Sequence, residues 1–243
     1  RETLTENNMG DQAENFLMAS GKLQALCYKA EIEAALRTPG FAGFHLLQLH
    51  DFPGQGTALV GVLNPFFESK GYIAPEEFRM FCNETVPLAR MQKEVYLNSE
   101  SFKADIEISH FGAKPLIKPV IICKVLTSSG DTIFTESFKK EEILIGNCIQ
   151  IGSLSFNLAK ILEPQKLKLV VSLENTSFKN SWDFWVYPAK QEVSVGGVLI
   201  TDKLDKNAET TLKKGGSVLL LTYGKVGKEK GAKVAIGFSS IFW

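Results

Sequence analysis

The order of apolar and polar positions divides the chain into stretches of different period. Residues 11–37 carry apolar side chains at steps of three and four, which predicts a helix. A near-continuous apolar run follows at residues 44–49 and ends at His50 and Asp51. Such a run is typical of a strand buried on both faces, and most strands of this kind belong to parallel sheets covered by helices. The early part of the chain is therefore predicted to be α/β.

The predicted helix carries two apolar stripes. One stripe passes through Phe16, Leu23, Cys27, Ala30 and Ala34, and the other passes through Tyr28, Ile32 and Leu36. A helix with apolar residues on two faces is expected to pack on more than one side. Pro39 and Gly40 end it, and Pro75 predicts the first turn of another helix.

From about residue 94 the apolar period changes from 3.6 to 2. Phe102, Ala104 and Ile106 alternate with charged residues, which predicts a half-buried strand. Further strands are expected at residues 119–126, 132–138, 147–156, 167–173 and 180–188. Several short strands separated by turns are typical of an immunoglobulin-like β-sandwich. Lysines at outward positions are expected to protect the sheet edges.

The pattern changes again from about residue 194. A short strand at residues 195–201, a helix at 207–214 and a second strand at 217–221 are expected. A strand–helix–strand unit implies a parallel sheet, here the start of a Rossmann-like α/β module. The glycine- and lysine-rich residues 224–231 depart from the phosphate-binding Walker pattern, and residues 238–243 are expected to form one more strand.

Charge and composition narrow the range of partners. Lysine plus arginine number 27, aspartate plus glutamate number 27, and the formal net charge is +0, so neither nucleic acid nor an anionic membrane is a predicted partner. No apolar run reaches the ~18 residues of a membrane span. The four cysteines are scattered without a C-x-x-C pair, which predicts free thiols. No metal site and no cofactor are predicted.

The candidate functional residues are His50, Asp51 and Gln55, at the end of the predicted strand. Strand ends in barrels and α/β sheets aim polar side chains into a shared crevice, which favours ligand contact or acid–base chemistry. The structural alternative is a strand end in which Asp51 accepts hydrogen bonds from the loop backbone. His45 and His50 are five residues apart and would face opposite sides of a strand, so His45 is expected to be a core histidine.

The chain resembles one family. Residues 19–24, 28–38, 43–61 and 70–72 resemble the last part of the catalytic TIM barrel of β-galactosidase-like proteins related to glycoside hydrolase family 2, common in glycan-degrading gut bacteria. Residues 182–188 and 237–243 resemble the accessory domains that follow that barrel. The resemblance implies a multidomain fold of α/β plus all-β class.

The expected domains follow from the patterns and the resemblance together. Residues 1–93 are expected to be the C-terminal part of a (β/α)8 barrel, and residues 94–190 the immunoglobulin-like sandwich. Residues 191–243 are expected to be a partial βαβ module. The start at Arg1 rather than Met is expected of a piece cut from a longer protein.

The resemblance also implies a function, which is hydrolysis of O-glycosyl bonds in a carbohydrate substrate. The two catalytic glutamates of the family belong at the ends of the fourth and seventh barrel strands, before Arg1, so no catalytic residue is assigned here. His50, Asp51 and Gln55 would line the rim of the sugar pocket. Retaining hydrolysis needs two carboxylates about 5 Å apart, so this chain alone is expected to be inactive. The resemblance implies a periplasmic or cell-surface location.

The rival hypothesis is a non-catalytic carbohydrate-binding or protein-interaction β-sandwich, which an exposed aromatic platform on the sandwich would favour. A nucleotide-binding role for residues 194–243 is a weaker third hypothesis, because the phosphate-binding motif is absent. An incomplete barrel leaves apolar faces uncovered, so a homodimer through residues 11–70 is also expected.

Overall fold

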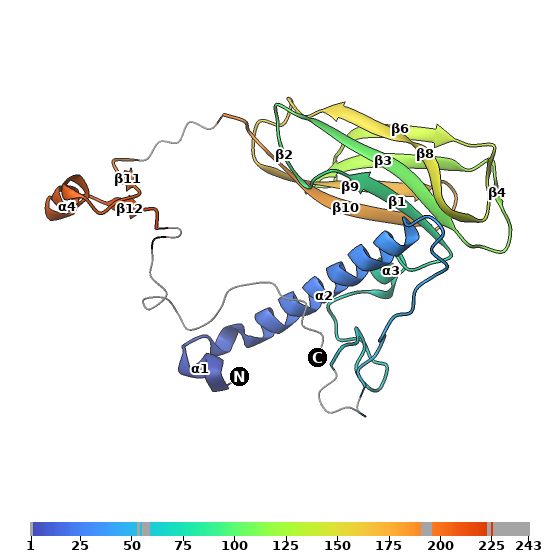
Figure 1. Cartoon of the computed structure of the whole chain (residues 1–243), viewed down its shortest axis with the longest axis horizontal. Coiled ribbons are helices and arrows are strands. Elements are labelled where there is room, and N and C mark those ends of the chain that lie inside the picture. The colour runs from blue at the N-terminus through green and yellow to red at the C-terminus, as the bar shows by residue number, and fades with distance from the viewer. Residues whose placement is uncertain (1, 53, 55–58, 191–195, 223–224, 226–243) are drawn as a thin grey trace. The chain divides into compact units, whose positions relative to one another are not determined.

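The computed structural model describes the chain except for residues 1, 53, 55–58, 191–195, 223–224 and 226–243 (Figure 1). The chain divides into two compact units, Arg1–Ala189 and Lys190–Trp243. The first unit contains a long helix, an irregular segment and a β-sandwich.

The long helix of the first unit is α2, Ala13–Leu36, which confirms the predicted helix. It follows a short helix α1, Glu2–Glu6, and a 3-10 turn η1, Gly10–Gln12. The buried residues of α2 are Gly21, Ala25, Ile32 and Glu33. Of the two predicted stripes, the one with Phe16 and Leu23 is exposed, at 42% and 54%. The described part of the chain therefore covers one face of α2 and leaves the other open.

The predicted strand at residues 44–49 is wrong, because this segment is irregular in the structure. Its pairing is limited to a parallel bridge between His50 and Leu63, and Phe44, Leu47 and Leu49 are 43%, 59% and 42% exposed. A central strand needs a neighbour on each side to bond its backbone, and the described residues supply only the isolated bridge to Leu63 here. Within the described residues there is accordingly no closed barrel. Pro75 does begin a helix, α3, Pro75–Phe78.

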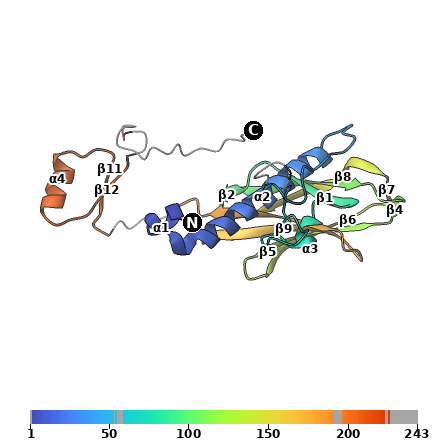
Figure 2. The same cartoon turned by 90° about the horizontal axis from the view of Figure 1, so that it is seen from below.

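The β-sandwich of the first unit is built from two sheets that lie face to face (Figures 1 and 2). The three-stranded sheet has the order β1-β3-β8 and is antiparallel. Its strands are β1, Thr85–Met91; β3, Ser101–His110; and β8, Gly146–Asn157. The five-stranded sheet has the order β2-β10-β9-β5-β6, in which β2 and β10 are the parallel pair.

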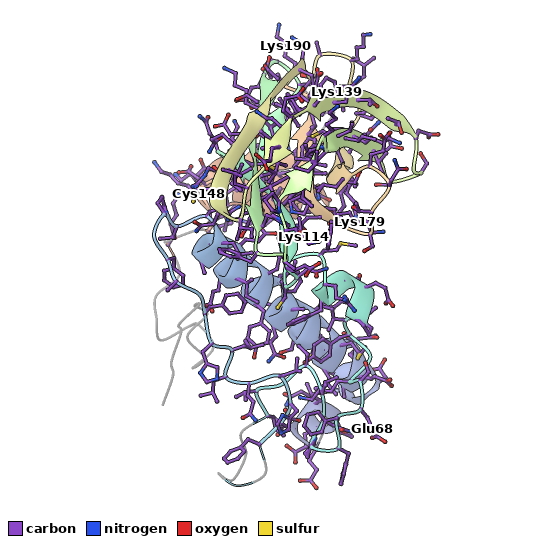
Figure 3. The ribbon with its side chains drawn as sticks, turned by 90° about the vertical axis from the view of Figure 1, so that its right-hand side faces the viewer. Glu68, Lys114, Lys139, Cys148, Lys179 and Lys190 are labelled. Carbon is purple, nitrogen blue, oxygen red and sulfur yellow. The ribbon has the colours of Figure 1, made fainter. Side chains whose placement is uncertain are left out.

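The remaining strands complete the sandwich. In the five-stranded sheet they are β2, Val95–Leu97; β5, Val120–Thr127; β6, Thr132–Lys139; β9, Gln165–Leu173; and β10, Lys179–Tyr187. A short pair, β4, Leu116–Ile117, and β7, Glu142–Ile143, lies at one end. The edge strand β6 ends at the exposed Lys139, labelled in Figure 3, in keeping with the expected lysine protection of sheet edges.

The core of the sandwich forms where the inward residues of the two sheets meet. Phe102, Ala104 and Ile106 of β3 are buried, which confirms the predicted alternation. The ring of Phe102 packs on that of Phe184 from β10 at a centroid distance of 4.4 Å. Close ring pairs of this kind add to the area buried and fix how the sheets face one another.

The second unit contains a strand–helix–strand unit, as predicted. Strands β11, Leu199–Thr201, and β12, Val218–Leu220, are parallel, and helix α4, Lys206–Lys213, connects them. Asp205 caps α4 by accepting from the backbone N–H groups of Asn207 and Ala208. A larger Rossmann-like sheet is not seen in the described residues, and the strand expected at residues 238–243 lies outside them. None of the described helices is long and apolar enough to span a membrane.

Candidate functional site

Asp51 is buried, at 4% exposure, and its carboxylate joins two segments of the loop that follows α2. Oδ1 of Asp51 accepts a hydrogen bond from the backbone N–H of Gly61 at 3.1 Å and from the ammonium of Lys70 at 2.7 Å. A buried carboxylate is costly unless it is paired and hydrogen-bonded, and this one is both. The arrangement therefore gives Asp51 a structural role in holding the loop.

The same loop is tied to helix α2. Lys70 donates to the Gly61 carbonyl at 2.7 Å, and the hydroxyl of Tyr72 lies 3.0 Å from that carbonyl and 2.7 Å from Oε1 of Gln24. A Cβ at Gly61 would lie 2.2 Å from the carbonyl carbon of His50, so only glycine fits there. We call Asp51, Gly61, Lys70 and Tyr72 the Asp51 clamp.

Burial raises the pKa of two tyrosines beside the clamp, Tyr28 and Tyr72. Both hydroxyls consequently stay protonated at neutral pH, and Tyr28 donates to the carbonyl of Val60 at 2.6 Å. The clamp region thus consists of satisfied polar groups that fix the loop on α2.

His50 precedes Asp51 and remains partly exposed. Its ring stacks on Phe67, with centroids 4.3 Å apart and planes inclined by 24°, and its nitrogens lie 3.3 and 3.4 Å from Nε2 of Gln48. His45, expected in the core, is exposed. Gln55 lies outside the described residues. The placement of His50, Asp51 and Gln55 at the rim of a sugar pocket stays a prediction.

A second polar cluster joins α2 to the sandwich. The carboxylate of Glu33, 3% exposed, accepts hydrogen bonds from Nδ2 of Asn180 at 2.7 Å and from Nε1 of Trp182 at 2.9 Å. It also pairs with the ammonium of Lys29, one turn earlier on α2. We call Lys29, Glu33, Asn180 and Trp182 the Glu33 hub.

The Glu33 hub reaches both sheets of the sandwich. Asn180 lies on β10 of the five-stranded sheet, and its Nδ2 also donates to the carbonyl of Pro87 on β1 at 2.9 Å. The ammonium of Lys29 lies 4.7 Å from the ring centroid of Trp182 and is bonded to Oδ1 of Asn180. Burial lowers the pKa of Lys29, and the charge of Glu33 opposes that shift. The hub therefore fixes α2 where the two sheets meet.

The C-terminal end of α2 is fixed by further contacts with the sandwich. Arg37 donates to the Ala89 carbonyl at 2.9 Å, and Arg90 donates to the Arg37 carbonyl at 2.6 Å. Nδ2 of Asn147 donates to the carbonyl of Thr38 at 2.8 Å. These contacts and the Glu33 hub hold the C-terminal half of α2 against the sandwich.

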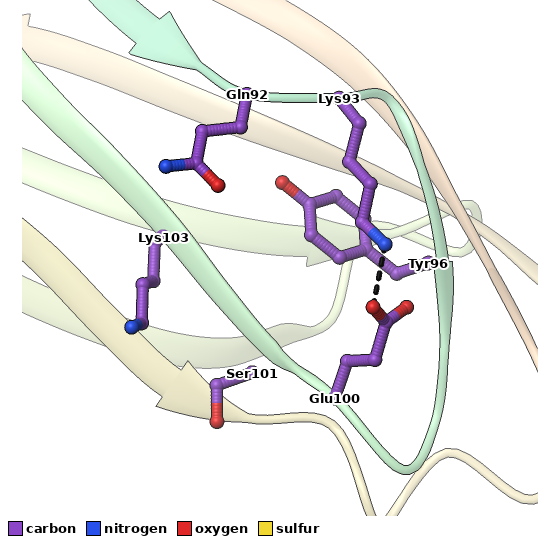
Figure 4. Close-up of a pocket in the computed structure, with 6 residues that line it drawn as sticks. All are labelled: Gln92, Lys93, Tyr96, Glu100, Ser101 and Lys103. Carbon is purple, nitrogen blue, oxygen red and sulfur yellow. Dashed lines mark hydrogen bonds and ion pairs between the residues drawn. The ribbon is translucent and has the colours of Figure 1, made fainter.

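The sandwich itself carries an open pocket of about 540 Å³ (Figure 4). It is lined by Gln92, Lys93, Tyr96, Glu100, Ser101 and Lys103. Lys93 pairs with Glu100 at 2.5 Å, and this bond, together with a hydrogen bond from the Leu97 N–H, lowers the pKa of Glu100. The pocket holds a single carboxylate, already paired, so it does not supply the two carboxylates of glycoside hydrolysis.

The described residues contain no cluster of histidine, cysteine, aspartate or glutamate suited to holding a metal ion. The four cysteines are free thiols, as the spacing predicted. Cys123 is buried in the core, and this burial raises the pKa of its thiol to about 12.

Comparison with known proteins yields one family and several partial structural similarities. A family described as a domain of unknown function, DUF8488, matches residues 100–188, which lie within the sandwich. No curated protein matches the chain.

Three solved structures show the extent of the structural similarity. The alkylpurine DNA glycosylase AlkC of Pseudomonas fluorescens is 14% identical, with a TM-score of 0.32 over 43% of this chain and 30% of that chain. The sporulation control protein Spo0M of Bacillus subtilis is 9% identical, with a TM-score of 0.31 over 45% and 51%. The β-glucuronidase of Parabacteroides merdae is 13% identical, with a TM-score of 0.31 over 42% and 14%.

These matches span about half or less of each solved chain, and none of them supports an assignment of function. The β-glucuronidase is a glycosidase, so the weak structural neighbours include an enzyme of the predicted class.

The sequence reasoning missed the Glu33 hub. Glu33 was not among the predicted functional residues. The available signal was its position beside Ile32 on the buried stripe and one turn after Lys29. Asn180 and Trp182 come from a strand about 150 residues later, and no local pattern connects them to α2.

Proposed function

We propose that this chain is part of a β-galactosidase-like glycoside hydrolase, consisting of the end of the catalytic barrel domain and the β-sandwich beside it. Both catalytic glutamates would lie outside residues 1–243. The observation that carries the proposal is a helix that docks on a sandwich through buried polar groups and holds a clamped loop with the family-like sequence at residues 43–61. The same helix and loop present apolar side chains outward.

The outward apolar side chains fit an element of a larger domain. Leu23 and Leu26 on α2 are 54% and 62% exposed, and Leu47, Phe66 and Phe67 in the loop segment are 59%, 82% and 63% exposed. Helices and strands of a domain bury one apolar side against another layer, and exposed apolar patches mark interaction sites. In the proposed parent enzyme, other barrel elements cover this surface.

The carboxylate of Asp51 is not free for the chemistry of the proposed enzyme. Retaining hydrolysis needs an acid/base and a nucleophile about 5 Å apart, whereas the carboxylate of Asp51 is already bonded to Gly61 and Lys70. The part played by this chain is then to hold the end of the barrel on the sandwich. The partly exposed ring of His50 would contribute to the rim of the sugar pocket.

When the chain is alone, the same apolar surface within residues 11–70 is expected to contact a second copy. Size-exclusion chromatography with light scattering of the 243-residue chain measures this. We expect twice the mass of 26.9 kDa, and a monomer at micromolar concentration would contradict the expectation.

The proposed activity is tested by hydrolysis of a chromogenic β-galactoside. We expect the natural gene product to hydrolyse it and the 243-residue chain to be inactive under the same conditions. Activity in the 243-residue chain itself would place the catalytic groups within it and would contradict the proposal. A natural product without activity toward a panel of chromogenic glycosides would favour the non-catalytic sandwich.

A further inference from the structure

The outer face of the five-stranded sheet carries an aromatic pair near the end of β10. Phe184 and Val186 are fully buried in the core. Because side chains alternate along a strand, Asp183, Trp185 and Tyr187 lie on the opposite, outer face. Trp185 and Tyr187 are two residues apart, so their Cα atoms are separated by about 7 Å along the strand.

The neighbouring strand β2 extends this surface. Its parallel register places Val95 beside Trp185 and Leu97 beside Tyr187. Val95 is 54% exposed, Leu97 is 45% exposed and Tyr187 is 41% exposed. We call these four residues the aromatic face. Since β2 is the edge strand, the aromatic face lies at one border of the sheet.

The aromatic face is bordered by positive charge. On β9, the ammonium of Lys166 lies 2.6 Å from Oδ2 of Asp183 and 5.8 Å from the ring centroid of Trp185. Lys168 lies 3.7 Å from the other oxygen of Asp183, and both lysine side chains are about half exposed, at 48% and 49%. Two ammonium groups therefore share one carboxylate, and the border carries a net charge of about +1 at neutral pH.

We propose that the aromatic face binds an acidic polysaccharide. The flat apolar side of a sugar ring carries C–H groups of slight positive charge, which are attracted to the negative faces of Trp185 and Tyr187. The carboxylate or sulfate groups of the sugar pair with Lys166 and Lys168 at the border. Charge complementarity thus selects an anionic chain over a neutral one.

A protein partner fits this surface less well. Interface cores are enriched in tyrosine and tryptophan but depleted in lysine, and here two lysines stand directly beside the aromatic residues. Single-stranded nucleic acid also uses aromatic side chains with basic ones, although its binding depends on a strongly positive surface. The proposal does not depend on the glycosidase proposal, because it concerns binding by the sandwich alone.

The test measures binding of the 243-residue chain to immobilised polygalacturonate, which carries carboxylates, and to heparin, which carries sulfates. Dextran serves as the neutral glycan and a poly-uridine oligonucleotide as the nucleic acid. We expect binding to at least one acidic glycan, weaker at higher salt, and none to dextran. The acidic glycan that binds more strongly shows whether the lysines recognise a carboxylate or a sulfate group.

Variants connect the binding to the aromatic face. Trp185→Ala is expected to weaken binding about tenfold and Trp185→Phe to retain most of it, since phenylalanine keeps a ring. Lys168→Gln is expected to weaken binding and to reduce its salt dependence. Phe111→Ala and Lys139→Gln, which change an exposed ring and an exposed lysine elsewhere on the sandwich, are the matched controls and are expected to bind as the wild type does.

Any of four results would overturn the proposal. The chain could fail to bind either acidic glycan, bind dextran equally well or bind the oligonucleotide more strongly, or Trp185→Ala could bind as the wild type does. Thermal unfolding of each variant separates a lost contact from a lost fold, and Trp185→Phe provides the comparison if Trp185→Ala unfolds. Failure here would leave hydrolysis by the natural gene product unaffected, so the two proposals fail independently.

Discussion

Glu33 shows how one buried carboxylate connects two parts of a fold. It receives hydrogen bonds from Asn180 and Trp182 and pairs with Lys29, while remaining 3% exposed. Removing one member of such a cluster leaves the other polar groups buried without a partner, which costs more than the net gain of forming the cluster.

We predict that Glu33→Ala lowers the free energy of unfolding of the first unit by about 3 kcal/mol. Urea denaturation followed by circular dichroism measures it. Glu31→Ala is the control, because Glu31 is an exposed glutamate on the same helix, and it should change the value by less than about 0.5 kcal/mol. Equal effects of the two substitutions would show that the Glu33 hub does not stabilise the fold.

Cys123 gives a second prediction at the scale of one residue. Its pKa is raised to about 12 by burial, so the thiolate that reacts with alkylating reagents is nearly absent at pH 8. We expect iodoacetamide to modify Cys27 and Cys148 well before Cys123 in the folded protein, as followed by peptide mass spectrometry. In urea the four cysteines should react alike. Early modification of Cys123 without urea would contradict its place in the core.

At the scale of elements, the Asp51 clamp is a structural unit of the loop after α2. The side chain of Asp51 is buried, at 6% exposure, and that of Lys70 is partly buried, at 23%. Both bond to the backbone of Gly61. Such pairs are coupled, so the cost of losing both is smaller than the sum of losing each.

We predict that Asp51→Ala and Lys70→Met each destabilise the protein, and that the double variant is less destabilised than the sum by more than about 1 kcal/mol. Chemical denaturation of the wild type, the two single variants and the double variant gives this coupling energy. Additive effects would show that the two side chains do not act as a pair. In the active parent enzyme, a loss of activity in Asp51→Ala that exceeds its loss of stability would support a direct role at the sugar pocket.

Elements with strong local periodicity were predictable from the sequence. The 3.6 period gave α2, and the alternation around Phe102 gave β3. The strand–helix–strand order after residue 194 was also predicted. In contrast, β1 was not predicted. Pro87 disfavours a central strand, but β1 is an edge strand, where proline is tolerated.

The segment at residues 44–49 shows where local pattern is insufficient. Its apolar run is suited to a buried strand, but a strand forms only where other strands bond its backbone. Similarly, the candidate site was predictable only in part. Asp51 was predicted at the end of a strand that the structure does not contain. Its hydrogen bond from the Gly61 N–H is the backbone contact of the structural alternative. Lys70, Tyr72 and the Glu33 hub depend on contacts distant in sequence, which composition and period do not reveal.

At the scale of the whole molecule, the chain contains two compact units, and the first combines a helix, a clamped loop and a sandwich. Buried polar groups hold the C-terminal half of α2 on the sandwich, while apolar side chains of α2 and the loop face outward. This combination is what an element joining a catalytic domain to an accessory sandwich would show, and it underlies the proposed function.

The measurement that tests this account most directly is the intact mass of the natural gene product, with peptide sequencing of any segment that precedes Arg1. The account predicts a product much heavier than 26.9 kDa, with a preceding segment that supplies two glutamates at the ends of barrel strands. A natural product of about 26.9 kDa would contradict the glycosidase proposal and would leave the sandwich, with its aromatic face, as the functional part of the protein.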